Sequence, residues 1–190
     1  MGLDLITLAE YKAYKGMSST SQDTIIKAIL PKVSALVKTY CRRTFLDYVN
    51  DSKTDVFKGG KDFYLLKETP VLQVASVEFS DDFGLTYTAM TEYSDYVMEN
   101  DEQLTLINDY FKNTTKPKAF KVTYNAGYEE LPIDLKLGVM DLVTYYLRHE
   151  GALHTQKNVG ANSVQIEYVT HTTLPANVRR VLDLHSAHYL

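Results

Sequence analysis

Two amphipathic segments lie far apart in this chain, and their separation constrains the fold more than any other feature. Apolar residues recur at a 3.6-residue period between Ile25 and Tyr40, and again between Leu135 and Leu147. Each stripe covers a full helix face, so each helix must bury that face against another element. The residues between them, about 45–125, mostly alternate with period two. We therefore predict an α+β fold, a small helical bundle (three helices plus a C-terminal helix) with an inserted, mostly antiparallel β-sheet.

The first helix of this bundle is predicted from its end signals. Thr7 and Glu10 have the spacing of a capping box, and Gly16 is a suitable helix stop. These residues predict a short helix over Leu8–Tyr14.

The longer helices carry similar signals. Ser19 with Gln22 is a second possible capping box before the stripe that starts at Ile25. Pro31 lies inside that stripe and cannot donate a backbone hydrogen bond, so we expect one kinked helix rather than two. Pro132 suits the first turn of the third helix, which should end near Gly151.

The middle of the chain is predicted to form short antiparallel strands joined by turns. Gly59 and Gly60 separate two apolar runs and predict a hairpin, since such a turn needs positive φ. Asp81–Gly84 and residues 99–102 have turn composition. The predicted strands include residues 75–79, 96–98, 104–107 and 120–124.

The C-terminal part is predicted to be an appendage. Residues 151–162 are polar and glycine-bearing, which is typical of a flexible link. Val164–Tyr168 alternates as a strand, and Pro175 can open a last helix. We therefore divide the chain into residues 1–150, the bundle with its sheet, and residues 151–190, a strand and a helix. The appendage has too little apolar surface to be stable alone, so it must dock on this molecule or on a neighbour.

Composition places the chain among ordinary globular proteins. Apolar residues make up 45% and charged residues 23%. No apolar run approaches the roughly 20 residues that span a bilayer, and the N-terminus lacks the pattern of a signal peptide. We therefore expect no membrane contact and synthesis in a cytoplasm. Cys41 is the single cysteine and is expected to be a buried small hydrophobe.

The charge is distributed unevenly. The net charge is −4, yet residues 68–111 hold ten acidic and no basic side chains, so the remainder carries +6. Solvated hairpin loops, calcium coordination, or a surface that faces a basic neighbour or passing DNA are all open interpretations of this block. Its candidate surface residues are Asp81, Asp82, Asp95, Glu99, Asp101 and Glu102.

No pattern in the sequence indicates a reaction. The chain lacks a glycine-rich phosphate loop and a serine nucleophile elbow. His185 and His188 could share a helix face, but two ligands do not make a zinc site. We predict no catalytic, cofactor-binding or metal-binding residues, hence no enzyme and no cofactor.

An ordered set of motifs, running from Leu5 to Leu184, resembles one protein family. A capped helix (ITLAEYKAYKG) and a longer helix (DTIIKAILPKVSALVKTYCRRTF) are followed by strand, turn and helix-start residues. These are Pro70, Val71, Val74, Ser76 and Val77, the string VTYNAGY with Gly127, then Pro132, Asp134 and Leu135, and finally Leu174, Pro175, Val178 and Leu182. In this order they resemble the head–tail connector (adaptor) proteins of tailed bacteriophages.

The resemblance implies a structural protein of the virion neck that is assembled in the host cytoplasm. Such connectors form a dodecameric ring beneath the portal protein, bind a stopper or tail-completion protein, and line a channel for double-stranded DNA without binding it specifically. The C-terminal segment is similar to the family's portal-embracing part. Its implied partner-binding residues are Val178, Arg179, Arg180, Val181 and Leu182. The acidic surface would face the next subunit or the channel.

Three alternatives stay open at this stage. One is a stopper or tail-completion protein, which would differ from an adaptor in the neighbours that it binds. Another is a small hydrolase or ligand-binding domain, for which the sequence offers no convergent polar site. The third is a DNA-binding regulator, which the acidic balance and the lack of a basic recognition helix disfavour.

Overall fold

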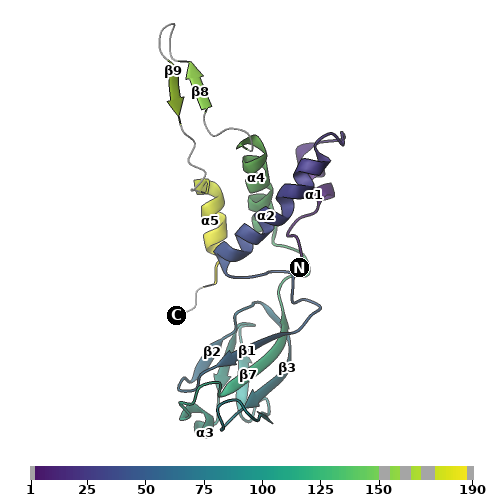
Figure 1. Cartoon of the computed structure of the whole chain (residues 1–190). Helices are drawn as coiled ribbons and strands as arrows, with labels where there is room; N and C mark the ends of the chain where they lie inside the picture. Colours follow the sequence, from purple (N-terminus) through teal and green to yellow (C-terminus); the bar gives the residue numbers. More distant parts are fainter. Residues whose placement is uncertain (1–2, 150–154, 159–163, 168–173, 188–190) are drawn as a thin grey trace. The chain divides into compact units, whose positions relative to one another are not determined.

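The computed structural model describes residues 3–149, 155–158, 164–167 and 174–187. The chain forms two compact units (Figure 1). The sheet unit consists of residues 43–131 with Leu3 and Ala187, and the helical unit consists of residues 4–42 and 132–186. The sheet unit is thus an insertion between two helices of the helical unit. The predicted α+β class is confirmed.

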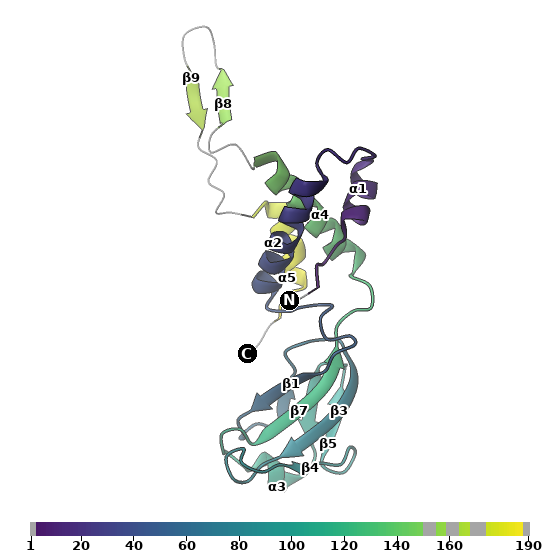
Figure 2. The ribbon, with the colours of Figure 1, turned by 45° about the vertical axis from the view of Figure 1, so that its right-hand side comes forward.

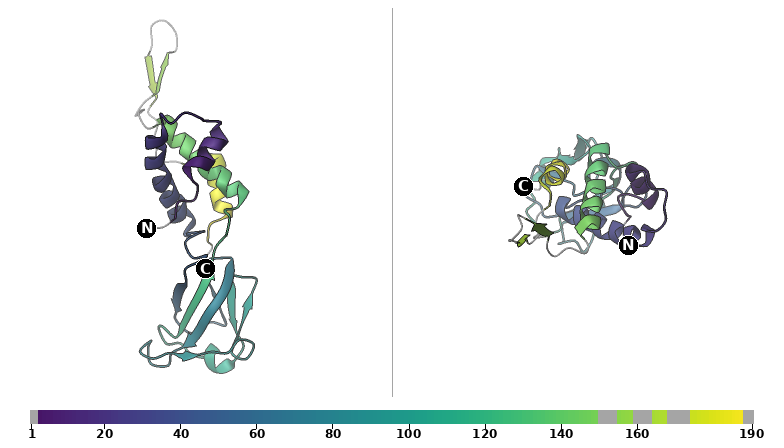
Figure 3. Two further views of the ribbon diagram at one scale, coloured as in Figure 1. Left: turned by 90° about the vertical axis from the view of Figure 1, so that its right-hand side faces the viewer. Right: turned by 90° about the horizontal axis from the view of Figure 1, so that it is seen from above.

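The helical unit contains α1 (Leu8–Lys15), α2 (Asp23–Cys41), α4 (Ile133–His149) and α5 (Ala176–Leu184). The buried residues of α2 and α4 follow the two stripes read from the sequence, and the two helices pack on each other. Helix α2 continues through Pro31 as one helix. Helix α4 lies between α1 and α5, as the view from above in Figure 3 shows. None of these helices is long and apolar enough for a membrane span.

Polar contacts join α4 to α1. Tyr11 is buried, and its hydroxyl lies 3.0 Å from the hydroxyl of Thr144. In the first turn of α1, Glu10 forms an ion pair with Lys136 of α4 (2.5 Å). The capping box of Thr7 and Glu10 is present as predicted, and Gly16 ends α1 with φ +62°.

The sheet unit consists of two antiparallel sheets and one short helix, α3 (Asp109–Lys112). The larger sheet has the order β1 (Lys53–Phe57), β7 (Phe120–Ala126), β3 (Val71–Phe79) and β4 (Thr88–Ala89). The smaller sheet has the order β2 (Phe63–Leu65), β6 (Gln103–Leu106) and β5 (Tyr96–Glu99). Figure 2 shows β1, β7 and β3 side by side.

Alternation along the strands builds one apolar core from both sheets. Along β7, Phe120, Val122 and Tyr124 are buried, while the residues between them are half-buried. They meet Leu104 and Leu106 of β6, which are also buried in this core. The core therefore follows the period-two pattern of the sequence.

Two local predictions are wrong. The strands that flank Gly59 and Gly60 do not form a hairpin, because β1 pairs with β7 and β2 pairs with β6. The segment crosses between sheets, and the Gly59 N–H donates to the carbonyl of Lys116 (2.9 Å). The second capping box is also absent, since α2 begins after Gln22 without a side-chain cap and Ser19 bonds to Ser21 instead.

The C-terminal part contains a hairpin of β8 (Thr155–Asn158) and β9 (Val164–Glu167). Strand β9 was predicted, but β8 falls in the segment interpreted as a flexible link. The rest of that link, residues 151–154 and 159–162, lies outside the described residues. Helix α5 starts directly after Pro175, as predicted.

Candidate interaction surfaces

Three of the six acidic candidates in the sheet unit form hydrogen bonds or ion pairs with the loops around them. Asp82 Oδ1 accepts hydrogen bonds from Ser80 Oγ (2.8 Å) and from the N–H groups of Leu85 (3.1 Å) and Thr86 (2.8 Å). Asp82 Oδ2 accepts from Thr86 Oγ1 (2.6 Å). The Thr86 contacts, helped by Ser80, lower the pKa of Asp82 from 3.8 to about 2.

Asp81 and Asp95 are also engaged within the sheet unit. Asp81 forms an ion pair with Lys116 (2.6 Å). Asp95 Oδ2 accepts from the N–H of Thr91 (2.8 Å), and its backbone carbonyl accepts from the N–H of Ile107 (2.9 Å). Asp81 is exposed and Asp95 is half-buried, and both carboxylates stabilise local structure.

The other three acids share one turn. Glu99, Asp101 and Glu102 surround the short connection between β5 and β6, and all three are exposed. Within the described parts of the chain, none of them forms an ion pair with a basic side chain. Glu99 Oε2 accepts a hydrogen bond from the neutral amide of Gln103 (3.0 Å), which leaves its charge unbalanced. Three of the six candidates therefore have internal roles, and three have charges that remain open to a partner.

The C-terminal candidates divide in a similar way. Val178 (1% exposed) and Leu182 (0%) are buried in the helical unit, and Val181 lies against Gly138 of α4. Arg179 and Arg180 of the same helix are exposed. Of these five candidates, the apolar residues hold α5 on its own bundle, and the two arginines face solvent.

Polar contacts fix α5 at both neighbouring helices. The Tyr40 hydroxyl of α2 donates to Asp183 (2.6 Å). His185 Nε2 lies 2.8 Å from the Asp134 carboxylate at the start of α4, and this bond lowers the pKa of Asp134. His185 thus contacts a carboxylate, while His188 lies outside the described residues. Cys41 is buried, as predicted, and its thiol donates to the Leu182 carbonyl (3.5 Å).

A buried polar cluster in the sheet unit was missed by sequence reasoning, which counted Glu68 with the acidic block. Asp55 and Glu68 are each 2% exposed. The Tyr124 hydroxyl donates to Asp55 Oδ2 (2.7 Å) and accepts from the N–H of Glu68 (3.1 Å). Glu68 Oε1 in turn accepts from the N–H of Thr44 (2.8 Å), and Lys53 Nζ lies 3.5 Å away. The cluster ties the segment after α2 to the sheet.

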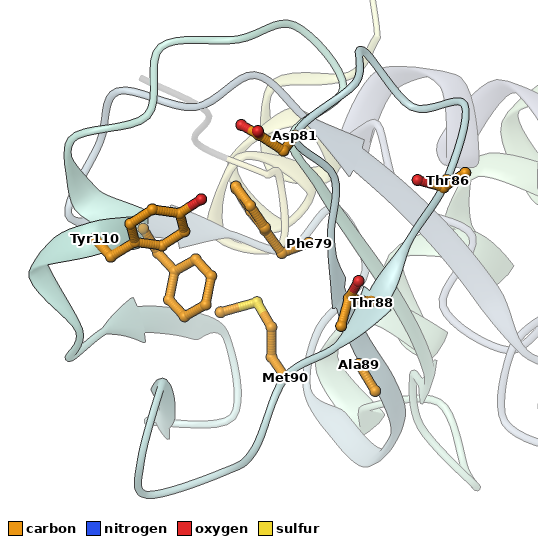
Figure 4. Close-up of a pocket in the computed structure, with 8 residues that line it drawn as sticks. Phe79, Asp81, Thr86, Thr88, Ala89, Met90 and Tyr110 are labelled. Atoms are coloured by element: carbon orange, nitrogen blue, oxygen red, sulfur yellow. The ribbon is translucent and has the colours of Figure 1, made fainter.

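The loops beside β4 and α3 expose large apolar side chains. Phe83 is 60% exposed, Leu85 83% and Tyr110 61%. Next to them lies a pocket of about 340 Å³, whose lining includes Phe79, Met90 and Tyr110 (Figure 4). Exposed apolar groups gathered in this way are typical of protein contacts. Among the described residues, no group of acids, histidines and cysteine could hold a metal ion.

The amino-acid sequence matches the model of the family described as head completion protein over residues 4–187. The chain belongs to the head completion protein family. This membership confirms the family-level resemblance that the ordered motifs indicated, and it makes the chain a structural component of a phage-like particle. No curated protein sequence is significantly similar to the chain.

Solved structures share the fold of this head completion protein family member from end to end. A chain of the neck of an empty gene transfer agent (GTA) particle, computed with C6 symmetry, matches with TM-score 0.59 and 13% identity. That match covers 98% of this chain and 91% of the other. A chain of the native particle's neck, computed with C12 symmetry, gives 0.56 and 14%, with coverage of 100% and 97%. A chain of the native GTA virion gives 0.60 and 15%, with coverage of 98% and 91%.

Proposed function

We propose that the chain is a structural subunit of a virion neck, where it forms a ring beneath the portal and joins the capsid to a stopper or tail-completion protein. One observation carries the proposal. The similarity to neck chains of gene transfer agent particles covers both units, with 98–100% of this chain and 91–97% of those chains. The whole molecule, and not one widespread domain, therefore matches a neck component.

The ring is proposed to be dodecameric. One of the similar neck structures was computed with C12 symmetry and another with C6 symmetry. In a closed ring each subunit presents two different surfaces, one to each neighbour. The two units of this chain have different surface chemistry, which suits such a heterologous contact.

The ring is proposed to surround DNA without binding it specifically. Residues 43–131 hold 16 acidic and 9 basic side chains, a net charge of −7. A negative surface repels phosphates and lets a duplex pass without sticking. The exposed acids either line the channel or face the next subunit, and no catalytic step is needed for either role.

Helix α5 is proposed to contact the portal protein through Arg179 and Arg180, which are exposed. Val178 and Leu182 are buried and would contribute by holding the helix in place. Val181 lies against Gly138 of α4 and helps to hold α5 in the same way. Of the five partner-binding residues that the resemblance implies, the two arginines are thus proposed to make the contact, and the three apolar residues to support the helix.

Deletion of the gene from its parent phage tests the proposal. We expect filled heads that lack tails, and restoration of complete particles by the gene supplied on a plasmid. Substitution of Arg179 and Arg180 by Glu should keep the protein folded but reduce its incorporation. The double variant Lys27→Glu with Lys32→Glu, an equal charge change at exposed residues of α2, should not. Complete, infectious particles from the deletion strain would contradict the proposal.

A further inference from the structure

The turn between β5 and β6 presents three carboxylates on a rigid backbone. Asn100 and Asp101 have φ values of 52° and 53°, and the flanking Glu99 and Gln103 are paired across the hairpin. Two consecutive residues in this conformation are typical of a tight hairpin turn, which fixes the direction of its side chains. We call Glu99, Asp101 and Glu102 the acidic turn. As described above, it is exposed and its charges are not neutralised by neighbours.

A groove in the helical unit carries positively charged side chains instead. It lies where α1 ends, along the second half of α4, and at the start of α5, and its volume is about 390 Å³. Lys15 and Arg148 line it, are exposed, and pair with no carboxylate in the part of the chain that the structure describes. We call this the basic groove.

The groove's own acid, Asp141, accepts a hydrogen bond from the Tyr14 hydroxyl (2.8 Å) and offsets part of the positive charge. One further feature of the basic groove favours an incoming carboxylate. Helix α5 begins there after Pro175 without a side-chain cap, and its second residue, Asn177, lines the groove. Uncapped N–H groups at a helix start carry partial positive charge, which adds to the field of the two basic side chains.

The two units also have net charges of opposite sign. The sheet unit, which bears the acidic turn, has a net charge of −7 over residues 43–131. Residues 4–42 and 132–186 hold 11 basic and 8 acidic side chains, a net charge of +3. Because one chain carries both complementary surfaces, a second copy of the chain is the partner that fits both.

We propose that the acidic turn of one copy docks in the basic groove of the next copy. This contact rests on the ring proposed above and names the surfaces that would join its subunits. It is heterologous, since each copy uses a different surface toward each neighbour. Lys15 and Arg148 would pair with the carboxylates, and Asn177 would offer an amide donor at the rim.

Disulfide cross-linking between two full-length variants tests the contact. Asp101→Cys in one variant and Asn177→Cys in the other place thiols on the two surfaces, and the native Cys41 is buried. We expect the mixed, oxidised variants to give a disulfide-linked dimer at roughly fivefold the yield of a control pair, Asp101→Cys with Lys27→Cys. A double variant with both cysteines should give a ladder of higher oligomers. Yields equal to the control, or only an intramolecular bond in the double variant, would overturn the proposal.

Charge reversal gives a second, independent readout. Arg148→Glu added to the Asn177→Cys variant, or Glu102→Lys added to the Asp101→Cys variant, should reduce the dimer yield to near the control level. Their combination should restore it, whereas Lys27→Glu should change nothing. If the combined variants do not restore cross-linking, the proposed pairing is contradicted. Cross-linking together with complete particles from the deletion strain would refute the proposed function alone. Tailless heads from the deletion strain without this cross-link would refute the contact alone.

Discussion

A single carboxylate organises the loop that exposes Phe83 and Leu85. Asp82 accepts four hydrogen bonds from neighbours in residues 80–86, and Gly84 N–H donates to Ser80 Oγ (2.8 Å). Phe83 has φ +65°, a conformation that a non-glycine residue rarely adopts. The hydrogen bonds to Asp82 compensate for that cost and keep two apolar side chains in solvent.

The ionised form of Asp82 is therefore predicted to stabilise the fold. Its folded-state pKa of about 2 lies below the ordinary value of 3.8, so the stabilisation is present above pH 4 and decreases as the pH falls toward 2. Asp82→Asn should lower the Tm at neutral pH and lose this acid-dependent component. Thermal unfolding followed by circular dichroism across that range checks it. Asp62→Asn, an equal change at an exposed residue of the same unit, should leave the pH profile unchanged.

Gly127, directly after β7, is predicted to tolerate a side chain poorly. It has φ +116°, and a Cβ there would lie 2.2 Å from the Phe45 carbonyl oxygen. Gly127→Ala should therefore destabilise the sheet unit by about 3 kcal/mol or more. Gly16→Ala, at φ +62° with open space around it, should cost about 1 kcal/mol. Urea denaturation compares the two variants, and equal losses would contradict this explanation.

At the scale of elements, α5 is predicted to be part of the bundle core. Leu182 is 0% exposed, whereas Leu184 of the same helix is 74% exposed. Leu182→Ala should cost about 2–5 kcal/mol, because it removes buried apolar contacts and leaves a cavity. Leu184→Ala should change stability by less than about 0.5 kcal/mol. Chemical denaturation of both variants measures the difference, and a stable Leu182→Ala protein would show that α5 does not need this packing.

The sequence predicts helices here better than strand partners. Apolar periodicity and end signals such as Thr7, Gly16 and Pro132 are local, so α1, α2, α4 and α5 could all be anticipated. Strand pairing is not local: β1 and β2 are close in sequence but pair with β7 and β6. Helix α3 has only four residues, which is too short to show a period.

The candidate surfaces could be predicted only in part, because side-chain contacts, like strand pairing, are not local in the sequence. Composition located the acidic block, but could not separate Asp82, which serves its own loop, from Asp101, which forms no ion pair among the residues that the structure describes. It also could not show that Glu68 is buried beside Tyr124. One local signal existed, because Asp55 occupies an alternating position with Phe57 in β1, on the side that faces the core.

At the scale of the whole molecule, the two units are predicted to unfold separately. Each has its own core, and the chain passes between them near residues 3–4, 42–43, 131–132 and 186–187. Hydrogen exchange followed by mass spectrometry should show two groups of amides with different opening free energies. Leu182→Ala should lower protection in the helical unit alone, and Gly127→Ala in the sheet unit alone. A uniform loss of protection from either substitution would indicate a single cooperative unit.

The insertion of residues 43–131 within the helical unit also has a consequence for biosynthesis. Helix α2 leaves the ribosome with its apolar face complete, but its partner α4 follows only after the entire sheet unit has been translated. At translation rates of about 5–20 residues per second, that delay lasts several seconds. The nascent α2 must spend this interval with Ile26 and Val33 uncovered, so it is the segment where a chaperone should first bind.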